Sequence, residues 1–149
     1  MDEKIILLVE DNADDEELIR IAFHESHIVS QLIVVHSGAE ALDYLFGTGA
    51  YAGRGLSGMP HLVLLDVKLP KLHGLEVLRR LRADNRTRLL PVVILTSSDE
   101  EKDVLTSYSL GANSYIRKPV DSGQFTEAVR QLGLYWLVLN EPPPRRVRV

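Results

Sequence analysis

The sequence contains no cysteine and no long apolar run. Without cysteine, the chain has no disulfide bonds, no thiolate nucleophile and no cysteine-bound zinc, and it suits a reducing compartment. No apolar stretch reaches the roughly 18–20 residues that cross a membrane. The first residues are acidic and lack the basic region of a signal peptide. We therefore expect a cytoplasmic protein that does not contact a membrane.

The sequence also has fewer basic than acidic residues. Lys and Arg number 17 against 21 Asp and Glu, which gives a formal net charge of −4. Eight acidic residues fall within residues 1–17, and three arginines fall within the last five residues. Negative surface charge repels the phosphates of nucleic acids and attracts cations and basic partners. We therefore expect no binding to DNA.

The length of 149 residues, 45% of them hydrophobic, is enough for one domain with a buried core. We predict a domain over residues 1–140 and a Pro/Arg tail over residues 141–149, because three consecutive prolines end the last helix. A separate DNA-binding or catalytic output domain has no room within this length.

Five short apolar runs alternate with segments whose apolar residues repeat at helical spacing. The runs cover residues 5–9, 32–35, 62–65, 92–95 and 114–116. The first four are continuous rather than alternating, which is typical of strands covered on both faces in a parallel sheet. The pattern predicts an α/β fold, a flavodoxin-like doubly wound (βα)5 three-layer sandwich with a five-stranded parallel sheet and right-handed crossovers.

Local patterns mark where the helices begin and where the regular alternation is interrupted. Three capping boxes are expected, at residues 37–40, 98–101 and 121–124. A glycine-rich insertion covers residues 47–60, and the last helix is expected to extend to about Asn140. The arginines of residues 79–88 are interpreted as a solvated helix face. None of the five histidines has convincing metal-ligand spacing.

The residues that end the predicted strands carry the chemistry. Glu10 and Asp11 follow the first strand, Asp66 the third, Thr96 ends the fourth and Lys118 follows the fifth. These strand ends meet at one edge of a parallel sheet. Three crowded carboxylates without His or Cys favour a hard cation, Mg²⁺ or Mn²⁺. The ammonium and hydroxyl add an anion site, which suits phosphoryl transfer to a carboxylate nucleophile.

Simpler interpretations of the same residues remain open at this point. The three acids could be solvated, Lys118 could lie on the surface, and Thr96 could cap a helix. Tyr115 could be a half-buried aromatic side chain in an outer strand. The acids and Lys118 are the least expected to be incidental, because charges at the end of an apolar strand are costly to bury and a proline follows Lys118.

Residues 4–134 resemble the receiver domain of two-component response regulators. The matching segments occur in order, and most of them lie at the end of a predicted strand. They are Val9-Glu10-Asp11-Asn12, Leu64-Leu65-Asp66-Val67-Lys68-Leu69-Pro70, Gly74, Leu95-Thr96-Ser97 and Gly111-Ala112-Asn113-Ser114-Tyr115-Ile116-Arg117-Lys118-Pro119.

The resemblance implies a role for each residue of the acidic site. Asp66 is the phosphoacceptor, and Asp11 is a direct Mg²⁺ ligand that Glu10 assists. The backbone carbonyl of Lys68 is the third protein ligand of the metal. Lys68 and Ser98 also occupy the two positions that tune dephosphorylation in this family.

The resemblance also implies the residues that respond to phosphorylation. Lys118 pairs with the phosphoryl group, and its bond to Pro119 is expected to be cis. Thr96 forms a hydrogen bond to the phosphoryl group and moves together with Tyr115 as a switch. The face of the first helix that includes Asp14 and Asp15 is a kinase-docking surface by the same resemblance.

A narrower resemblance concerns the small regulators that partner phytochrome-type photoreceptor kinases. The insertion and the ending Leu132-Gly133-Leu134-Tyr135-Trp136-Leu137 carry it. The last helix is apolar on nearly all sides, which indicates an interface, and we expect a homodimer through this helix and the tail. The expected interface residues are Phe125, Val129, Leu132, Tyr135, Trp136 and Leu139.

Taken together, the sequence predicts a single-domain response regulator that a sensor histidine kinase phosphorylates on Asp66 with Mg²⁺. It is not an enzyme beyond Mg²⁺-dependent self-phosphorylation and autodephosphorylation, and it acts on an unknown downstream protein or through its dimer. A phosphatase of the haloacid dehalogenase type needs an acid where Lys68 stands. A flavodoxin-like FMN binder needs a hydroxyl- and glycine-rich loop where residues 10–15 are acidic. A degenerate receiver that only binds partners is the remaining alternative.

Overall fold

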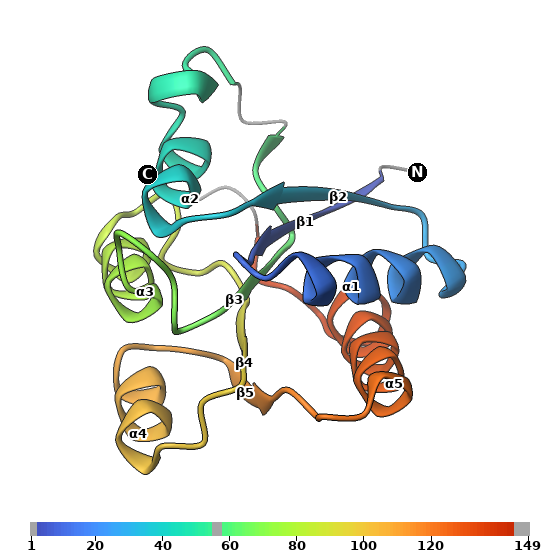
Figure 1. Cartoon of the computed structure of the whole chain (residues 1–149). Helices are drawn as coiled ribbons and strands as arrows, with labels where there is room; N and C mark the ends of the chain where they lie inside the picture. The colour runs from blue at the N-terminus through green and yellow to red at the C-terminus, as the bar shows by residue number, and fades with distance from the viewer. Residues whose placement is uncertain (1–2, 55–57, 145–149) are drawn as a thin grey trace.

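Five parallel strands form one sheet in the computed structural model, which describes residues 3–54 and 58–144 (Figure 1). The strand order is β2-β1-β3-β4-β5. The strands are β1 (Lys4–Val9), β2 (Ser30–Val35), β3 (Leu62–Leu65), β4 (Val92–Thr96) and β5 (Ser114–Arg117). The direction of the order reverses between β1 and β3, and the predicted doubly wound fold is confirmed.

Helices cover both faces of the sheet, as Figure 1 shows, and produce the three layers. One face carries α1 (Ala13–Glu25) and α5 (Ser122–Leu134), which pack against each other. The other face carries α2 (Gly38–Phe46), α3 (Gly74–Ala83) and α4 (Glu101–Ser109). The continuous apolar runs are explained by this arrangement, because successive strand residues point to opposite faces and both faces are buried.

The side chains of each strand divide between two apolar cores. Leu7 and Val9 pack under α2 and α3, whereas Ile6 and Leu8 pack under α1 and α5. Fully buried residues of β3 and β4 alternate in the same way. The sheet is therefore fixed in register by burial on both sides.

Three residues of the predicted dimer interface belong to the second core instead. Phe125, Val129 and Leu132 are at most 4% exposed and pack with residues of α1 and the sheet. The prediction that they lie in an interface between two copies is wrong, because the inward stripe of α5 is needed to cover the sheet.

The end of the last helix is where the apolar surface remains. After α5 the chain continues through one π-helical turn, η3 (Tyr135–Leu139), and leaves the helix at Asn140, which confirms the predicted extension. Leu137 is buried, whereas Tyr135 and Leu139 are 49% and 66% exposed. Trp136 packs edge-on against Tyr135 with ring centroids 5.0 Å apart. The predicted tail arginines lie outside the described residues.

Two of the three predicted capping residues accept a hydrogen bond at the start of their helix. The Ser37 hydroxyl accepts a hydrogen bond from the Glu40 amide at the start of α2, and the Asp121 side chain accepts one from Gln124 at the start of α5. The box at residue 98 is wrong. Helix α4 follows Glu100 without a side-chain cap, because the Ser98 hydroxyl donates to buried Asp103 instead.

The described part of the glycine-rich insertion folds back onto the end of α2. Gly47 ends the helix in the left-handed region, with φ +66°. The Tyr44 hydroxyl donates to the Gly58 carbonyl at 2.6 Å, and Arg54 donates to the carbonyls of Tyr44 and Leu45. A short 3-10 turn, η1 (Gly49–Tyr51), places the Tyr51 ring edge-on against Tyr44. The insertion is thus attached to the fold by specific bonds.

Arg82 departs from the prediction of a solvated arginine face. Its guanidinium donates to the carbonyls of Gly111, Arg88 and Leu90, and to the Asn113 side chain at 3.0 Å. The side chain therefore joins the end of α3 to the loop before β5. Charge-assisted bonds of this kind to several carbonyls fix the geometry of a loop.

Within residues 3–54 and 58–144, no helix combines the length and the apolar character that a membrane crossing requires.

Close approach of α3 to the end of β3 requires glycine at residue 74. The Gly74 amide donates to the Val67 carbonyl at 2.9 Å, and a Cβ atom here would overlap the carbonyl oxygen of Asp66. We predict that Gly74→Ala lowers the free energy of unfolding by about 2–3 kcal/mol, because the first turn of α3 has to move away.

Urea unfolding followed by circular dichroism measures this change, with Gly123→Ala as the control. Gly123 also lies in the first turn of a helix, and its nearest neighbour is the exposed Asp121 carboxylate. A change within about 1 kcal/mol is expected there. Equal effects at both positions would contradict the argument.

Candidate functional site

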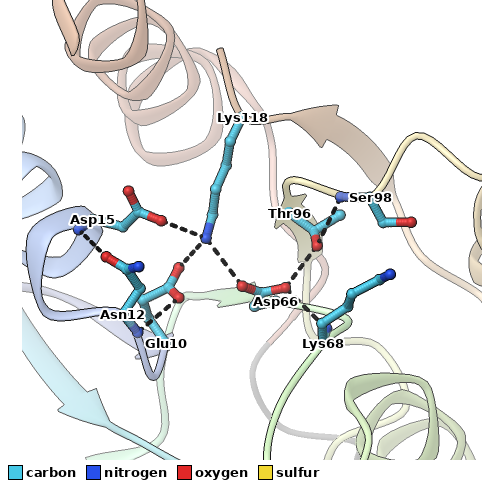
Figure 2. A network of polar contacts seen from close by, with 8 residues as sticks. All are labelled: Glu10, Asn12, Asp15, Asp66, Lys68, Thr96, Ser98 and Lys118. Atoms are coloured by element: carbon cyan, nitrogen blue, oxygen red, sulfur yellow. Dashed lines mark hydrogen bonds and ion pairs between the residues drawn. The ribbon is translucent and has the colours of Figure 1, made fainter. Parts of the chain in front are cut away.

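The registers of the strands bring polar residues together at the carboxyl edge of the sheet. Val9 pairs with Leu65, so Glu10 and Asp66 are neighbours where β1 and β3 end. Thr96 pairs with Arg117 at the end of β4 and β5, which places Lys118 beside it. The Lys118 amide donates to the Thr96 carbonyl at 2.7 Å. Figure 2 shows these side chains converging from four strand ends.

The Lys118 ammonium lies at the centre of the site. Its Nζ atom is 2.7 Å from Glu10 Oε1, 2.8 Å from Asp15 Oδ2 and 3.0 Å from Asp66 Oδ2 (Figure 2). The side chain is only 7% exposed, so Lys118 is not a surface lysine. Burial by itself lowers the pKa of Lys118, but the three carboxylates outweigh it and raise that pKa overall. The group is a permanent cation at neutral pH.

Asp66 is buried and held by three donors. Its Oδ1 atom accepts hydrogen bonds from the Thr96 hydroxyl at 2.6 Å and from the Lys68 amide at 2.9 Å, and Oδ2 faces Lys118. The Thr96 hydroxyl therefore serves Asp66 and does not cap α4. These three bonds fix the orientation of the Asp66 carboxylate.

Three carboxylates come close enough to share a cation. Glu10, Asp11 and Asp66 each offer an oxygen, and these oxygens lie within 4.8 Å of one another. Oxygen-only ligands of this kind fit a divalent cation such as Mg²⁺ or Mn²⁺. The part of the backbone carbonyl of Lys68 as a further ligand stays a prediction.

The surroundings of Glu10 disfavour the ionised form of its carboxyl group. It is 1% exposed, and burial raises its pKa from 4.5 to about 7 even though the bond and attraction to Lys118 lower it. The nearby Asp66 carboxylate raises the pKa of Glu10 further. A second cation beside Glu10 would therefore relieve a real electrostatic cost.

A short chain of bonds leads from Asp66 to α4 and β5. The Ser98 amide approaches the Thr96 hydroxyl at 3.4 Å, and the Ser98 carbonyl accepts a bond from the Tyr115 hydroxyl at 2.8 Å. The Ser98 hydroxyl donates to Asp103 in α4 at 2.6 Å. Any shift of Thr96 thus acts on a segment that contacts both elements. The switch role of Thr96 and Tyr115 itself stays a prediction.

The two positions that are expected to tune dephosphorylation point elsewhere. The Ser98 hydroxyl turns away from Asp66 toward Asp103, as Figure 2 shows for the serine. The Lys68 ammonium lies 3.7 Å from Glu100 on the loop before α4, where both side chains are about half exposed. Neither contact reaches Asp66 directly.

Asp15 is the site residue that sequence reasoning missed. We expected it on an exposed docking face, yet its side chain points at Lys118 (Figure 2). Asn12 caps α1 through a 2.9 Å bond from the Asp15 amide, which puts Asp15 in the first helical turn next to the end of β1. Local spacing gave no signal for this contact, because Lys118 is 103 positions away in the sequence.

The expected cis bond before Pro119 is not present. Among residues 3–54 and 58–144 the structure has no cis peptide bond. The trans form is the lower-energy isomer of a bond to proline. Lys118 reaches all three carboxylates in this form.

Comparison with known proteins gives consistent matches along the chain. The response regulator receiver domain model matches residues 6–130. Response regulator Rcp1 of Synechocystis sp. is 37% identical over 134 residues, covering 90% of this chain and 89% of that protein. The crystal structure of its Mn²⁺-bound form has a TM-score of 0.88 at 35% identity, over 95% of this chain and 99% of that one.

Two further structures are similar. The crystal structure of the phosphorylated cyanobacterial phytochrome response regulator RcpA has a TM-score of 0.90 and 37% identity, over 96% of this chain and 100% of that one. The bacteriophytochrome response regulator RtBRR is 51% identical with a TM-score of 0.75, over 97% of this chain and 86% of that one.

The raised pKa of Glu10 predicts how stability varies with pH in the absence of a divalent cation. Between pH 4.5 and about 7 the folded protein binds this proton more tightly than the unfolded chain does. The free energy of unfolding therefore falls as pH rises through this range, by roughly 3 kcal/mol from this group. Above about pH 7 the contribution is constant.

Glu10→Gln should remove this pH-dependent loss and leave the variant more stable than the unmodified protein at pH 8. Urea unfolding in EDTA at several pH values measures the slope. Glu17→Gln, an exposed change in α1, should keep the original slope. A slope that survives in Glu10→Gln would show that another group causes it.

Proposed function

This chain belongs to the response regulator receiver domain family, and we propose that it is a two-component response regulator of a single domain. A sensor histidine kinase transfers a phosphoryl group to Asp66 in the presence of Mg²⁺. The observation that carries this proposal is the buried Asp66 carboxylate, held by Thr96, Lys68 and Lys118 beside a cluster of acids.

The side chains of the site divide the work of the transfer. One Asp66 oxygen attacks phosphorus while the bond to the kinase histidine nitrogen breaks, and the acyl phosphate forms on Asp66. Lys118 places a fixed positive charge where the phosphoryl oxygens arrive, and Thr96 can turn its hydroxyl from Asp66 to one of them. A bound Mg²⁺, held by Glu10, Asp11, Asp66 and the Lys68 carbonyl, would neutralise further negative charge.

The signal then passes through residues already in contact. When Thr96 leaves Asp66, the Ser98 segment shifts, and the Tyr115 hydroxyl that it holds is released or re-bonded. The surface formed by α4, β5 and α5 changes its contacts with a downstream protein. Such a two-state segment, biased by one local charge, is a common form of switch.

Other functions fit the geometry less well. A haloacid dehalogenase-type phosphatase would need a general acid where Lys68 stands, and that lysine pairs with Glu100. An FMN phosphate would meet Glu10, Asp11 and Asp15 after β1. A degenerate receiver that only binds partners would have no need of a complete pocket. The self-phosphorylation and autodephosphorylation of this site are proposed as Mg²⁺-dependent side reactions.

The kinase proposed as partner is a photoreceptor of the bacteriophytochrome type. Support comes from the names of RcpA and RtBRR, which are phytochrome and bacteriophytochrome response regulators. The proposal places the protein in the cytoplasm, where a soluble kinase domain would meet it. The formal charge of −4 argues against binding to DNA.

A homodimer through the end of the last helix is also proposed. The exposed apolar side chains there are Leu134, Tyr135, Val138 and Leu139, with Trp136 beside them. Contiguous apolar surface of this kind is typical of an interface. The tail is included in the proposal, although residues 145–149 are outside the described part.

Phosphorylation is predicted to depend on Asp66 and on a divalent cation. Intact-mass analysis after incubation with acetyl phosphate and Mg²⁺ should show one phosphoryl adduct on the unmodified protein. Asp66→Asn should show none, and EDTA should prevent the adduct. Asp99→Asn, the same change at an exposed site just after β4, should leave labelling intact.

The same assay decides between donors. Transfer from the phosphohistidine of a bacteriophytochrome kinase should be faster than transfer from a kinase of another class. An adduct on Asp66→Asn would overturn the assigned acceptor. If no donor labels the unmodified protein, the phosphoacceptor proposal fails.

The dimer is predicted to weaken when a charge enters the exposed end of the helix. Leu139→Glu should shift the protein from dimer to monomer in sedimentation velocity, with at least about tenfold weaker association, because the carboxylate would be buried in the interface. Val29→Glu adds the same charge at a 71% exposed apolar residue elsewhere and should keep the dimer. A monomeric unmodified protein would contradict the proposal.

A further inference from the structure

Asp15 contacts Lys118. It is not part of the acidic cluster of Glu10, Asp11 and Asp66. We propose that Asp15 is a positioning residue that keeps Lys118 beside Asp66 when a divalent cation occupies Glu10 and Asp11. The inference deepens the proposed function and rests on it, since it concerns the same site.

The geometry gives Asp15 a fixed place beside the ammonium. Its Oδ2 atom is 2.8 Å from Lys118 Nζ, and its side chain is 24% exposed. The backbone amide of Asp15 is bound to Asn12 at 2.9 Å, so the carboxylate extends from the rigid first turn of α1. In Figure 2 Asp15 and Asp66 lie on opposite sides of the Lys118 nitrogen.

Two cations compete for the same carboxylates in this site. Glu10 binds Lys118 at 2.7 Å and also belongs to the cluster that fits a metal, as does Asp66. A divalent cation there repels the ammonium and draws Glu10 away from it. Lys118 then needs another partner, since an unpaired buried ammonium is costly.

Asp15 supplies that partner because it lies outside the acidic cluster of Glu10, Asp11 and Asp66. Its carboxylate remains available to Lys118 whichever cation Glu10 faces. Lys118 can thus give up Glu10 and remain in place, bound to Asp15 on one side and to Asp66 or its phosphoryl group on the other. Removing Asp15 would leave the ammonium more strongly bound to Glu10, in competition with the metal.

Asp14 is the matched control that distinguishes an effect through Lys118 from a general effect of charge on α1. Asp14 lies in the same turn of α1, is exposed, and carries the same charge toward the same helix terminus. Any effect of bulk charge or of the helix dipole should appear in both Asp14→Asn and Asp15→Asn. An effect through Lys118 should appear in Asp15→Asn alone.

The test measures cation binding without any phosphodonor. Titration calorimetry with Mg²⁺, and with Mn²⁺ as a second probe, is performed on both Asn variants in the unmodified and Lys118→Met backgrounds. We expect Asp15→Asn to weaken binding about five- to tenfold and Asp14→Asn less than about twofold. In the Lys118→Met background, Asp14→Asn and Asp15→Asn should change the cation affinity equally, because the contact between Asp15 and Lys118 is gone.

Two results would overturn the inference. One is equal weakening by Asp14→Asn and Asp15→Asn when Lys118 is present. The other is an excess effect of Asp15→Asn that persists in Lys118→Met. Thermal unfolding of every variant shows whether it remains folded. Each Asn variant is compared with the protein that has the same residue at position 118, so an effect of Lys118→Met itself does not enter the comparison.

A second measurement separates this inference from the proposed function. At saturating Mg²⁺, Asp15→Asn should accept a phosphoryl group from acetyl phosphate about tenfold more slowly, because Lys118 is less well positioned. Asp14→Asn should match the unmodified protein, and a match by Asp15→Asn would count against positioning. If the unmodified protein takes no phosphoryl group at all, the proposed function fails, whereas the cation titration still decides the role of Asp15.

Discussion

A single buried ammonium allows acidic side chains to gather at the end of this sheet. Without Lys118, the carboxylates of Glu10, Asp15 and Asp66 would repel one another in a region that water hardly reaches. Three carboxylates face one ammonium there, and burial, with a smaller contribution from the nearby Asp66 carboxylate, raises the pKa of Glu10. Lys118 thus neutralises the carboxylates only in part, and the remaining negative charge favours binding of a divalent cation. The strand registers, the glycine at residue 74 and the cap of α1 all serve to hold this arrangement.

A short series of hydrogen bonds connects Asp66 to α4 and β5. Thr96 is the only residue of β4 that contacts Asp66 through a side-chain hydrogen bond in the described part of the chain. Two residues later, the Ser98 carbonyl binds Tyr115 and its hydroxyl binds Asp103. Since all three neighbours are buried or half-buried, a change at Asp66 has a short and rigid route to α4 and β5.

The fold was predictable because burial on both faces leaves a continuous apolar run in β1, β3 and β4. Asp66, Thr96 and Lys118 were predictable for a related reason, since strand ends meet at one edge whatever the loops do. Side-chain direction was not. Ser98 turns inward to a buried aspartate, Arg82 finds carbonyls rather than water, and Phe125 faces the sheet. Each outcome depends on a partner distant in sequence, which local spacing does not reveal.

The site is assembled from both ends of the chain, and this has a consequence for synthesis. Lys118 bonds to residues 103 and 52 positions earlier in the sequence. Asp11 and Asp66 are synthesised before Lys118, which directly follows β5, the last strand of the described sheet. A chain that ends after β4 would therefore contain the acidic cluster without its buried ammonium. The site is complete only when the last strand of the described sheet has formed, so assembly of the site is coupled to completion of the sheet.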